Sequence, residues 1–172
     1  VLDDEGAEKL IAAAKKQNVP IIADPKLTGL HRTQGVDWVL FQSKGLELMR
    51  RRLGAATGTE AASILLETND WNHLLILEGQ DGVTIHSRNT ETVHVQCMLE
   101  EIRQMIGLID AAAVAVATAI TLGLSVEETA HIANAASECI LVADRTDRFV
   151  LRLDDMIDRI GEIAWSLQVS KR

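Results

Sequence analysis

Three polar residues stand where helix or strand composition would not ordinarily place them. Asp110 lies near the start of an alanine-rich apolar segment. A carboxylate there can act as a base, or it can simply be stabilised by the positive end of a helix dipole. Asn134 lies mid-way along a second alanine-rich segment, which disfavours asparagine, so a binding role competes with a packing role. Lys26 follows an apolar run and either holds a phosphate or marks the end of a strand.

A Gly-x-x-Gly turn, Gly79-Gln-Asp-Gly82, follows another apolar run. Glycines let a ligand approach the backbone, but they also make plain hairpin turns, so both interpretations stay open. His73 and His131 are lone histidines without a second ligand at metal spacing, and we predict no metal site. Cys97 and Cys139 lie in apolar stretches, which favours buried free thiols in a reducing cytoplasm.

Length and charge narrow the class of protein. The 172 residues fit one domain, and 47% of them are apolar, enough for a sizeable core. The net charge of −8 disfavours nucleic acid and anionic membrane as partners, because their own negative charge would repel the chain. The apolar run 106–124 contains Asp110 and is dominated by alanine, so it predicts a buried helix and not a membrane span.

Strands and helices alternate along the chain and must position these residues. Unbroken apolar runs predict strands buried on both faces, as in a parallel sheet, and Ser125 with Glu128 predicts a capping box. We expect an α/β fold in three layers, a mostly parallel sheet between helices, with the first three strands adjacent and parallel. The predicted strands are 19–23, 38–41, 73–77, 83–86 and 91–95, and the predicted helices are 7–17, 45–53, 60–68, 106–122, 126–143 and 154–167.

The order of four local motifs resembles the C-terminal half of the ribokinase-like (PfkB) carbohydrate kinases, and within them the heptose-phosphate kinase branch. The resemblance covers nearly the whole chain, 1–172, which we predict to be a single, partial ribokinase-like domain. The motifs are Val19-Pro-Ile-Ile-Ala-Asp-Pro-Lys26, Gly35-Val-Asp-Trp-Val-Leu-Phe-Gln42, Leu74-Leu-Ile-Leu-Glu-Gly-Gln-Asp-Gly82, and Gly107-Leu-Ile-Asp110 followed by Gly123-Leu-Ser125 and Ala133-Asn-Ala-Ala136.

The resemblance implies transfer of the γ-phosphoryl group of ATP, with Mg²⁺, to a sugar hydroxyl. In the family a Gly-Ala-Gly-Asp signature opens a helix, where its aspartate takes the hydroxyl proton and the helix N-terminus holds the phosphoryl group. Carried over to this chain, Asp110 and Gly107 are the catalytic candidates. The implied nucleotide-binding candidates are Gly79, Gly82, Asn134 and Lys26.

The departures from the family pattern fall on the phosphoryl site. Ile109 replaces the second glycine, and one blocked oxyanion donor can cost about 10²–10³ in rate. The family's Asp-x-Thr before the first glycine is replaced by Gln104-Met105-Ile106. The family's Asn-x-x-Glu, which helps to organise magnesium, is replaced by Gln42 and Gly45. Glu47 lies two residues further on and either compensates or is a solvated helix residue. Family members are also nearly twice as long, and the missing half carries most sugar-binding residues.

Three functional hypotheses remain. The leading one is a degenerate kinase-like module with a role in binding or assembly, in which binding of ATP and Mg²⁺ stays open. The second is an active ATP-dependent carbohydrate kinase completed by another chain or copy. The third is a non-kinase α/β domain that resembles the family by chance. Because half a sheet exposes apolar surface, we expect a homo-oligomer, a partner chain or an upstream part of the same gene product to cover it.

Overall fold

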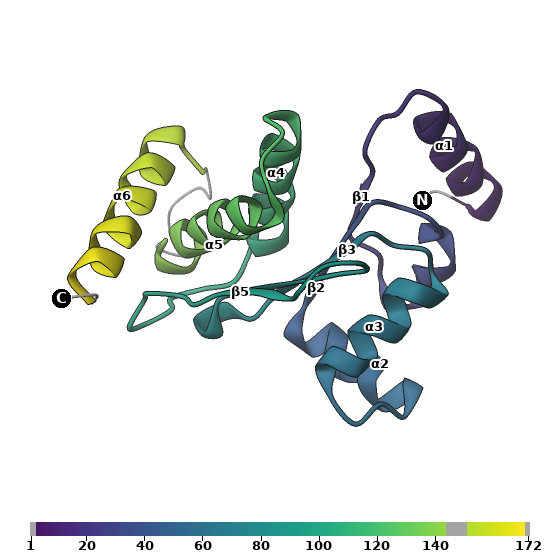
Figure 1. Cartoon of the computed structure of the whole chain (residues 1–172), viewed down its shortest axis with the longest axis horizontal. Coiled ribbons are helices and arrows are strands. Elements are labelled where there is room, and N and C mark those ends of the chain that lie inside the picture. The colour runs from purple at the N-terminus through teal and green to yellow at the C-terminus, as the bar shows by residue number, and fades with distance from the viewer. Residues whose placement is uncertain (1–2, 144–150, 171–172) are drawn as a thin grey trace. The chain divides into compact units, whose positions relative to one another are not determined.

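The computed structural model describes residues 3–143 and 151–170, with side chains as far as 164. Its five strands form one sheet in the order β1-β2-β3-β4-β5, mostly parallel, which confirms the α/β class (Figure 1). The elements are α1 (Asp4–Lys16), β1 (Ile22–Ala23), η1 (Leu27–Thr33), β2 (Trp38–Gln42), α2 (Ser43–Leu53), α3 (Gly58–Thr68), β3 (His73–Leu77), η2 (Gly79–Asp81), β4 (Val83–Ser87), β5 (Val93–Val95), α4 (Leu108–Thr121), α5 (Val126–Val142) and α6 (Leu153–Ser170).

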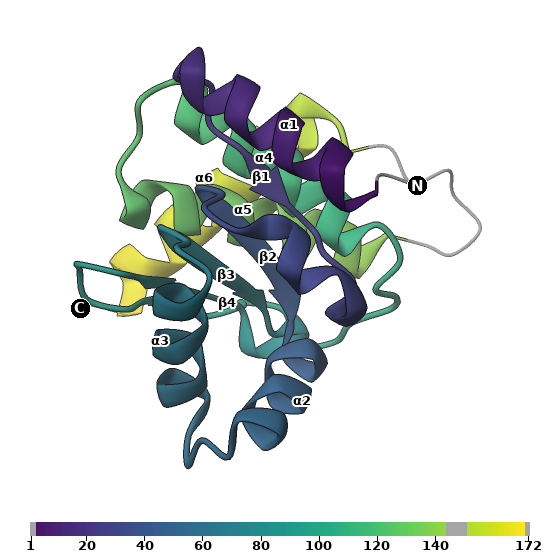
Figure 2. The ribbon, with the colours of Figure 1, turned by 90° about the vertical axis from the view of Figure 1, so that its right-hand side faces the viewer.

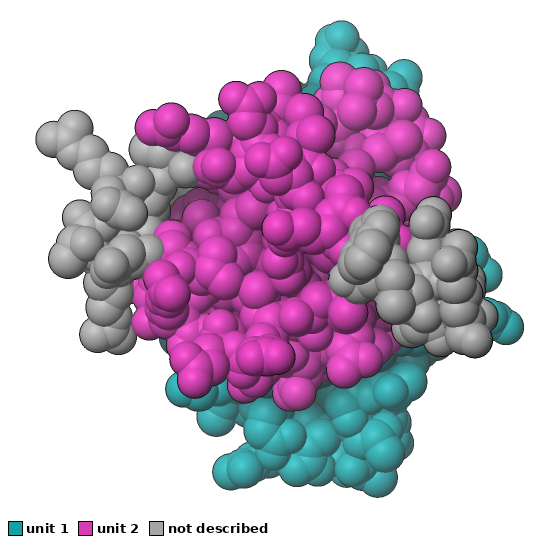
Figure 3. All heavy atoms as spheres, turned by 90° about the vertical axis from the view of Figure 1, so that its left-hand side faces the viewer, with its two compact units in different colours: residues 1–76, 85–92 teal, residues 77–84, 93–172 magenta. Residues whose placement is uncertain are grey.

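The chain divides into two compact units, which Figure 3 shows in different colours. Unit 1 comprises residues 1–76 and 85–92, and unit 2 comprises residues 77–84 and 93–172. Within the described residues 3–143 and 151–170, no helix has both the length and the apolarity needed to cross a bilayer.

Strands β2 and β3 in unit 1 are buried on both faces. Val39 and Phe41, alternate residues of β2, belong to an apolar cluster that also contains residues of α2 and α3, which lie side by side in Figure 1. The intervening Leu40 is fully buried as well, as is Leu75 in β3. Burial on both faces explains the unbroken apolar runs, because a half-exposed strand would alternate apolar with polar residues.

The first strand is shorter than its apolar run predicted, although its place beside β2 is confirmed. Ile22 and Ala23 pair in parallel with β2 (Figure 2), whereas Val19 is 54% exposed. Pro20 has no N–H to give to a ladder, and the Ile21 N–H donates to the Asp37 carboxylate at 2.9 Å. The 3₁₀ segment η1 that follows was not predicted, because its sequence lacks a helical period.

Three helices dominate unit 2, with α5 in contact with both α4 and α6. The predicted capping box at the start of α5 is confirmed: the Ser125 hydroxyl accepts from the Glu128 N–H while the Glu128 carboxylate accepts from the Ser125 N–H. Alanines on the facing surfaces of α4 and α5, such as Ala115 and Ala136, let the two backbones lie close together. This close packing fixes the start of α4, where the candidate catalytic residues lie.

Candidate functional site

Gly107 turns the chain into α4. It has φ +82° and caps the helix without a side chain, a conformation that a β-carbon would strain. Leu108 is 1% exposed and anchors the first turn in the core, which leaves Asp110 exposed in the same turn. The Ala111 N–H bonds back to the Gly107 carbonyl at 2.9 Å. Among the described residues, the N–H groups of Ile109 and Asp110 have no acceptor, so this helix end presents free donors.

A buried glutamine holds the segment that enters this turn. Gln104 is 4% exposed, and its Nε2 donates to the Ile140 carbonyl at 2.5 Å while its Oε1 accepts from the Ile106 N–H at 2.7 Å. The neighbouring Arg103 N–H donates to the Leu141 carbonyl at 2.8 Å. Gln104 therefore ties the approach to Gly107 to the last turn of α5. Sequence reasoning treated Gln104 only as a departure from the family pattern and missed this positioning role.

The two positions of the Gly-x-x-Gly turn differ in how strictly they require glycine. Gly82 has φ +102°, and a β-carbon there would collide with the Val95 carbonyl oxygen and lie 2.8 Å from the Cys97 nitrogen. Gly79 has φ +65°, but a β-carbon would meet only the Met105 methyl carbon at 3.6 Å, an ordinary contact. Gly82 is thus required by the close passage of β5, whatever the turn binds, and a nucleotide role for either glycine stays a prediction.

A carboxylate directly precedes this turn. Glu78 Oε2 accepts from the Thr84 hydroxyl at 2.8 Å, and the same hydroxyl lies 2.8 Å from Nδ1 of His94. The exposed fractions of the Glu78 and His94 side chains are 27% and 49%, so the carboxylate is partly open to solvent. A negative charge beside a phosphate-binding turn would weaken phosphate binding by direct repulsion.

Asn134 lies in a buried charge network. It is 1% exposed, and its Nδ2 donates to Glu138 Oε1 at 2.9 Å. Glu138 is fully buried on α5 and also accepts from the Met98 N–H at 2.7 Å and from Arg159 of α6, whose Nε lies 2.5 Å away. The Asn134 Oδ1 has no partner in the described part of the chain. These hydrogen bonds explain why an asparagine is buried in the middle of a helix. The nucleotide-binding role of Asn134 stays a prediction.

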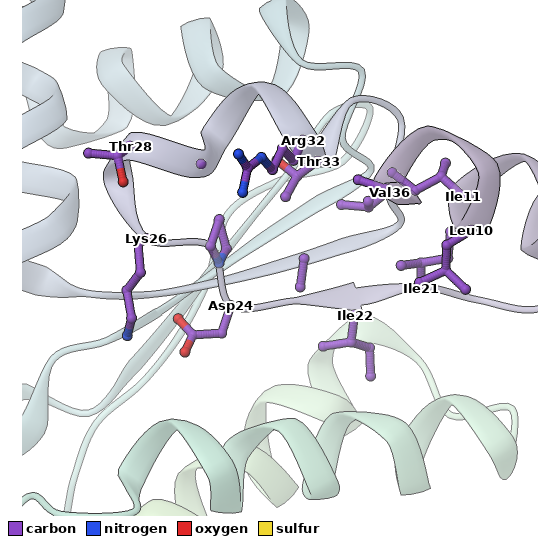
Figure 4. Close-up of a pocket in the computed structure, with 14 residues that line it drawn as sticks. Leu10, Ile11, Ile21, Ile22, Asp24, Lys26, Thr28, Arg32, Thr33 and Val36 are labelled. Carbon is purple, nitrogen blue, oxygen red and sulfur yellow. The ribbon is translucent and has the colours of Figure 1, made fainter. Parts of the chain in front are cut away.

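Lys26 lies in unit 1, at the edge of a cavity of about 580 Å³ between α1, β1 and η1. Figure 4 shows Lys26 and Asp24 extending to one side of the β1 strand and Arg32 to the other. Arg32 Nε lies 2.6 Å from Asp4 Oδ1, and His31 lies 3.1 Å from it. Hydrogen bonds from Arg32 and His31 hold the pKa of Asp4 below its ordinary value. Lys26 stays a predicted phosphate ligand.

The two positions that the family uses for magnesium lie at the start of α2. Gln42 is the N-cap of α2 and makes no side-chain capping bond, and a β-carbon at Gly45 would only touch the Phe41 ring at 3.7 Å. Glu47, the one carboxylate of α2, accepts from Arg50 Nε at 2.7 Å and from Arg51 Nε at 2.7 Å. Those hydrogen bonds lower the pKa of Glu47 to about 2. Glu47 is thus a paired helix-surface residue.

The structure places five of the six candidate residues in unit 2 and one in unit 1. Gly79, Gly82, Gly107, Asp110 and Asn134 belong to the first group and Lys26 to the second. Within the described ranges, 3–143 and 151–170, no group of three or more His, Cys, Asp or Glu side chains is placed to hold a metal ion. The start of α4 presents unpaired N–H donors beside one exposed carboxylate, Asp110.

Comparison with known proteins decides the family. The model of the pfkB family carbohydrate kinases matches residues 1–147. The chain belongs to this family. Curated relatives include the bifunctional protein HldE of Pelobacter propionicus, 27% identical over 133 residues, and that of Haemophilus influenzae, 27% identical over 135 residues. These alignments cover 72% and 78% of the chain but only 26% and 28% of the relatives.

Solved structures show the ribokinase-like fold. A mutant of Escherichia coli phosphofructokinase-2 matches with a TM-score of 0.78 at 17% identity, over 94% of this chain and 53% of that one. Thermotoga maritima ribokinase matches with a TM-score of 0.75 at 20% identity, over 90% and 53%. Arabidopsis thaliana ribokinase, solved with ribose and ATP, matches with a TM-score of 0.74 at 16% identity, over 92% and 53%. The pfkB-family chain thus spans about half the length of these structures.

Proposed function

We propose that this pfkB-family chain is a degenerate kinase-like module that binds an anionic phosphate group and assembles with a partner, without transferring phosphoryl groups itself. The observation that carries the proposal is the pairing of Glu47. It is the one carboxylate of α2, and its oxygens are bound by Arg50 and Arg51. A hard cation such as Mg²⁺ needs carboxylate oxygens that are free to coordinate it.

Phosphate fits the start of α4 better than magnesium fits α2. The N–H groups of Ile109 and Asp110 have no acceptor in the described chain, and the space beside Gly107 is open. Such donors and the helix dipole favour a phosphate oxygen. Asp110 and Glu78 oppose this attraction with two negative charges on the same unit. The balance favours weak phosphate binding that gains little from magnesium.

ATP and Mg²⁺ are the cofactors that the family implies. When bound to a complete site, they supply the phosphoryl group and neutralise its charge. In this chain, Gly107 and the free N–H groups would hold the phosphate, and Asp110 could accept a hydrogen-bonded proton. We derive no role for magnesium, because Gly45 offers no ligand and Glu47 is already paired.

Calorimetric titration with ATP, in excess magnesium and in a chelator, tests this proposal. We expect the same weak affinity in both conditions. The double variant Ile109→Gly with Gly45→Glu should bind ATP at least about tenfold more tightly in magnesium, and Ile109→Gly with Gly45→Gln is the matched control without the charge. A β-carbon at position 45 makes only ordinary contacts, so the variant should fold. A wild-type affinity that rises strongly with magnesium would contradict the proposal.

An active carbohydrate kinase, completed by another chain or copy, is the second candidate. It is favoured by Asp110, which is exposed at the start of α4 as a proton acceptor must be. The sugar-binding half would then come from the partner. Turnover by the assembled complex that Asp110→Asn abolishes would support this candidate over the first.

The proposed partner is a second copy or another protein that supplies the part of the fold that this chain does not span. The lengths of the solved structures support this proposal, because the chain covers only 53% of each of the two cited kinase chains. We further propose that the protein is cytoplasmic and binds neither nucleic acid nor membrane. The net charge of −8 disfavours binding to nucleic acid and anionic membrane. The free thiols of Cys97 and Cys139 support a reducing cytoplasmic location.

A further inference from the structure

Helix α6 carries an apolar stripe that the described residues leave uncovered. Leu153, Ile157 and Ile160 are 75%, 57% and 41% exposed, and Ala164 is exposed as well. Their spacing of four, three and four residues places them on one line along the helix. The side of α6 that packs against the rest of unit 2 is a different one, where Ile163 is buried. A continuous apolar surface is thus exposed to solvent over three consecutive turns of α6.

Gly161 borders this stripe and is hard to explain within one chain. A mid-helix glycine costs about 1 kcal/mol relative to alanine. No described atom lies within 4 Å of the place its β-carbon would take, so no contact in the described part of the chain requires a glycine there. A missing side chain beside an exposed apolar stripe lets a second helix come close.

We propose that α6 pairs antiparallel with α6 of a second copy of this chain. The spacing of the stripe is that of a two-stranded coiled-coil seam. In an antiparallel pair whose two-fold axis passes between Asp158 and Arg159, Leu153 lies opposite Ala164 of the second copy, and Ile157 lies opposite its Ile160. Leu153 then meets the small Ala164, and Ile157 meets a second isoleucine, so the stripe pairs apolar with apolar along its length and is complementary to itself.

Charge selects the antiparallel direction. The first half of α6 carries three aspartates, Asp154, Asp155 and Asp158. A parallel pair would bring all three aspartates of both copies to the same end and align the two helix dipoles. An antiparallel pair separates the two acidic ends. The stripe is only about three turns long, so we expect a small interface and a weak dimer that depends on concentration.

Sedimentation velocity over a range of concentrations provides the first test. We expect a monomer–dimer equilibrium that Ile157→Asp weakens at least about tenfold in dissociation constant. Val114→Asp is the matched control, because Val114 is 62% exposed on α4 and lies outside the stripe. A wild-type chain that stays monomeric at all concentrations, or a dimer that Ile157→Asp leaves intact, would overturn the proposal.

Disulfide trapping tests direction and register without relying on a weakened variant. In a Cys139→Ser background, Leu153→Cys combined with Ala164→Cys should oxidise to a covalent dimer. Leu153→Cys alone should not, because antiparallel helices keep the two copies of position 153 apart. Cross-linking of the single variant to the same extent would show a parallel or unspecific contact and reject the proposed pairing.

Discussion

Removing the guanidinium of Arg159 should strongly destabilise unit 2. Arg159 donates to Glu138, which is 0% exposed on α5, and the other bonds to that carboxylate come from the Asn134 amide and the Met98 N–H. In Arg159→Met, the methionine fills much of the same volume but leaves a buried carboxylate without its counter-charge. Breaking a buried pair in this way costs about 3–5 kcal/mol of the free energy of unfolding.

The matched changes separate the charge from the packing. Glu138→Gln in the Arg159→Met background removes the buried charge and should recover at least about 1–2 kcal/mol, because a neutral amide costs less to bury. Arg152→Met is the control, with the same substitution at the residue just before this helix: Arg152 is exposed, so its loss should change stability by less than about 0.5 kcal/mol.

Urea denaturation followed by circular dichroism gives the free energies of unfolding of these variants. A loss of stability in Arg159→Met no greater than that in Arg152→Met would refute the role of the buried pair. So would a further loss on adding Glu138→Gln to Arg159→Met, since that would mean the buried charge is satisfied without Arg159.

Two further predictions concern the turn and unit 1. Gly82→Ala should lower the free energy of unfolding by at least about 2 kcal/mol more than Gly54→Ala in urea titrations, because both positions have positive φ but only Gly82 meets the Val95 carbonyl. Burial holds the pKa of His73 and of His86 below its ordinary value, so the unfolded chain binds more protons. Stability should therefore fall as pH drops below about 6.5, and His73→Gln should reduce that slope; an unchanged slope would exclude His73 as a contributor.

The sequence predicted best the elements whose residues need no distant partner. The strand at 73–77 has the bounds of β3, because an unbroken apolar run can be covered only inside a sheet. The Ser125 capping box is local and was predicted with its partner. The strand at 19–23 was predicted too long, since the run looks apolar while Pro20 and the exposed Val19 lie outside the ladder.

The sequence predicted a helix that begins near Gly107 and Asp110, but not the residues that hold this helix start in place. Asp110 and Gly107 do share one helix start, as the resemblance implied. Glu138 lies four residues after Asn134, a spacing that places both on one helix face, although the sequence reasoning did not use it. Its counter-ion Arg159 lies 21 residues further on and could not be found by spacing. Gln104 looked like a loss from the motif, and only the position of the Ile140 carbonyl reveals its role.

Turnover by the purified chain tests the central claim most directly. ADP release would be measured with magnesium-ATP and a panel of sugars and sugar phosphates, for the wild type and for Asp110→Asn. We predict no sugar-dependent release above background in either protein. Asp110 offers a base, but Gly45 has no carboxylate to hold magnesium and the carboxylate of Glu47 is already paired with arginines. Sugar-dependent release that Asp110→Asn abolishes would contradict the account.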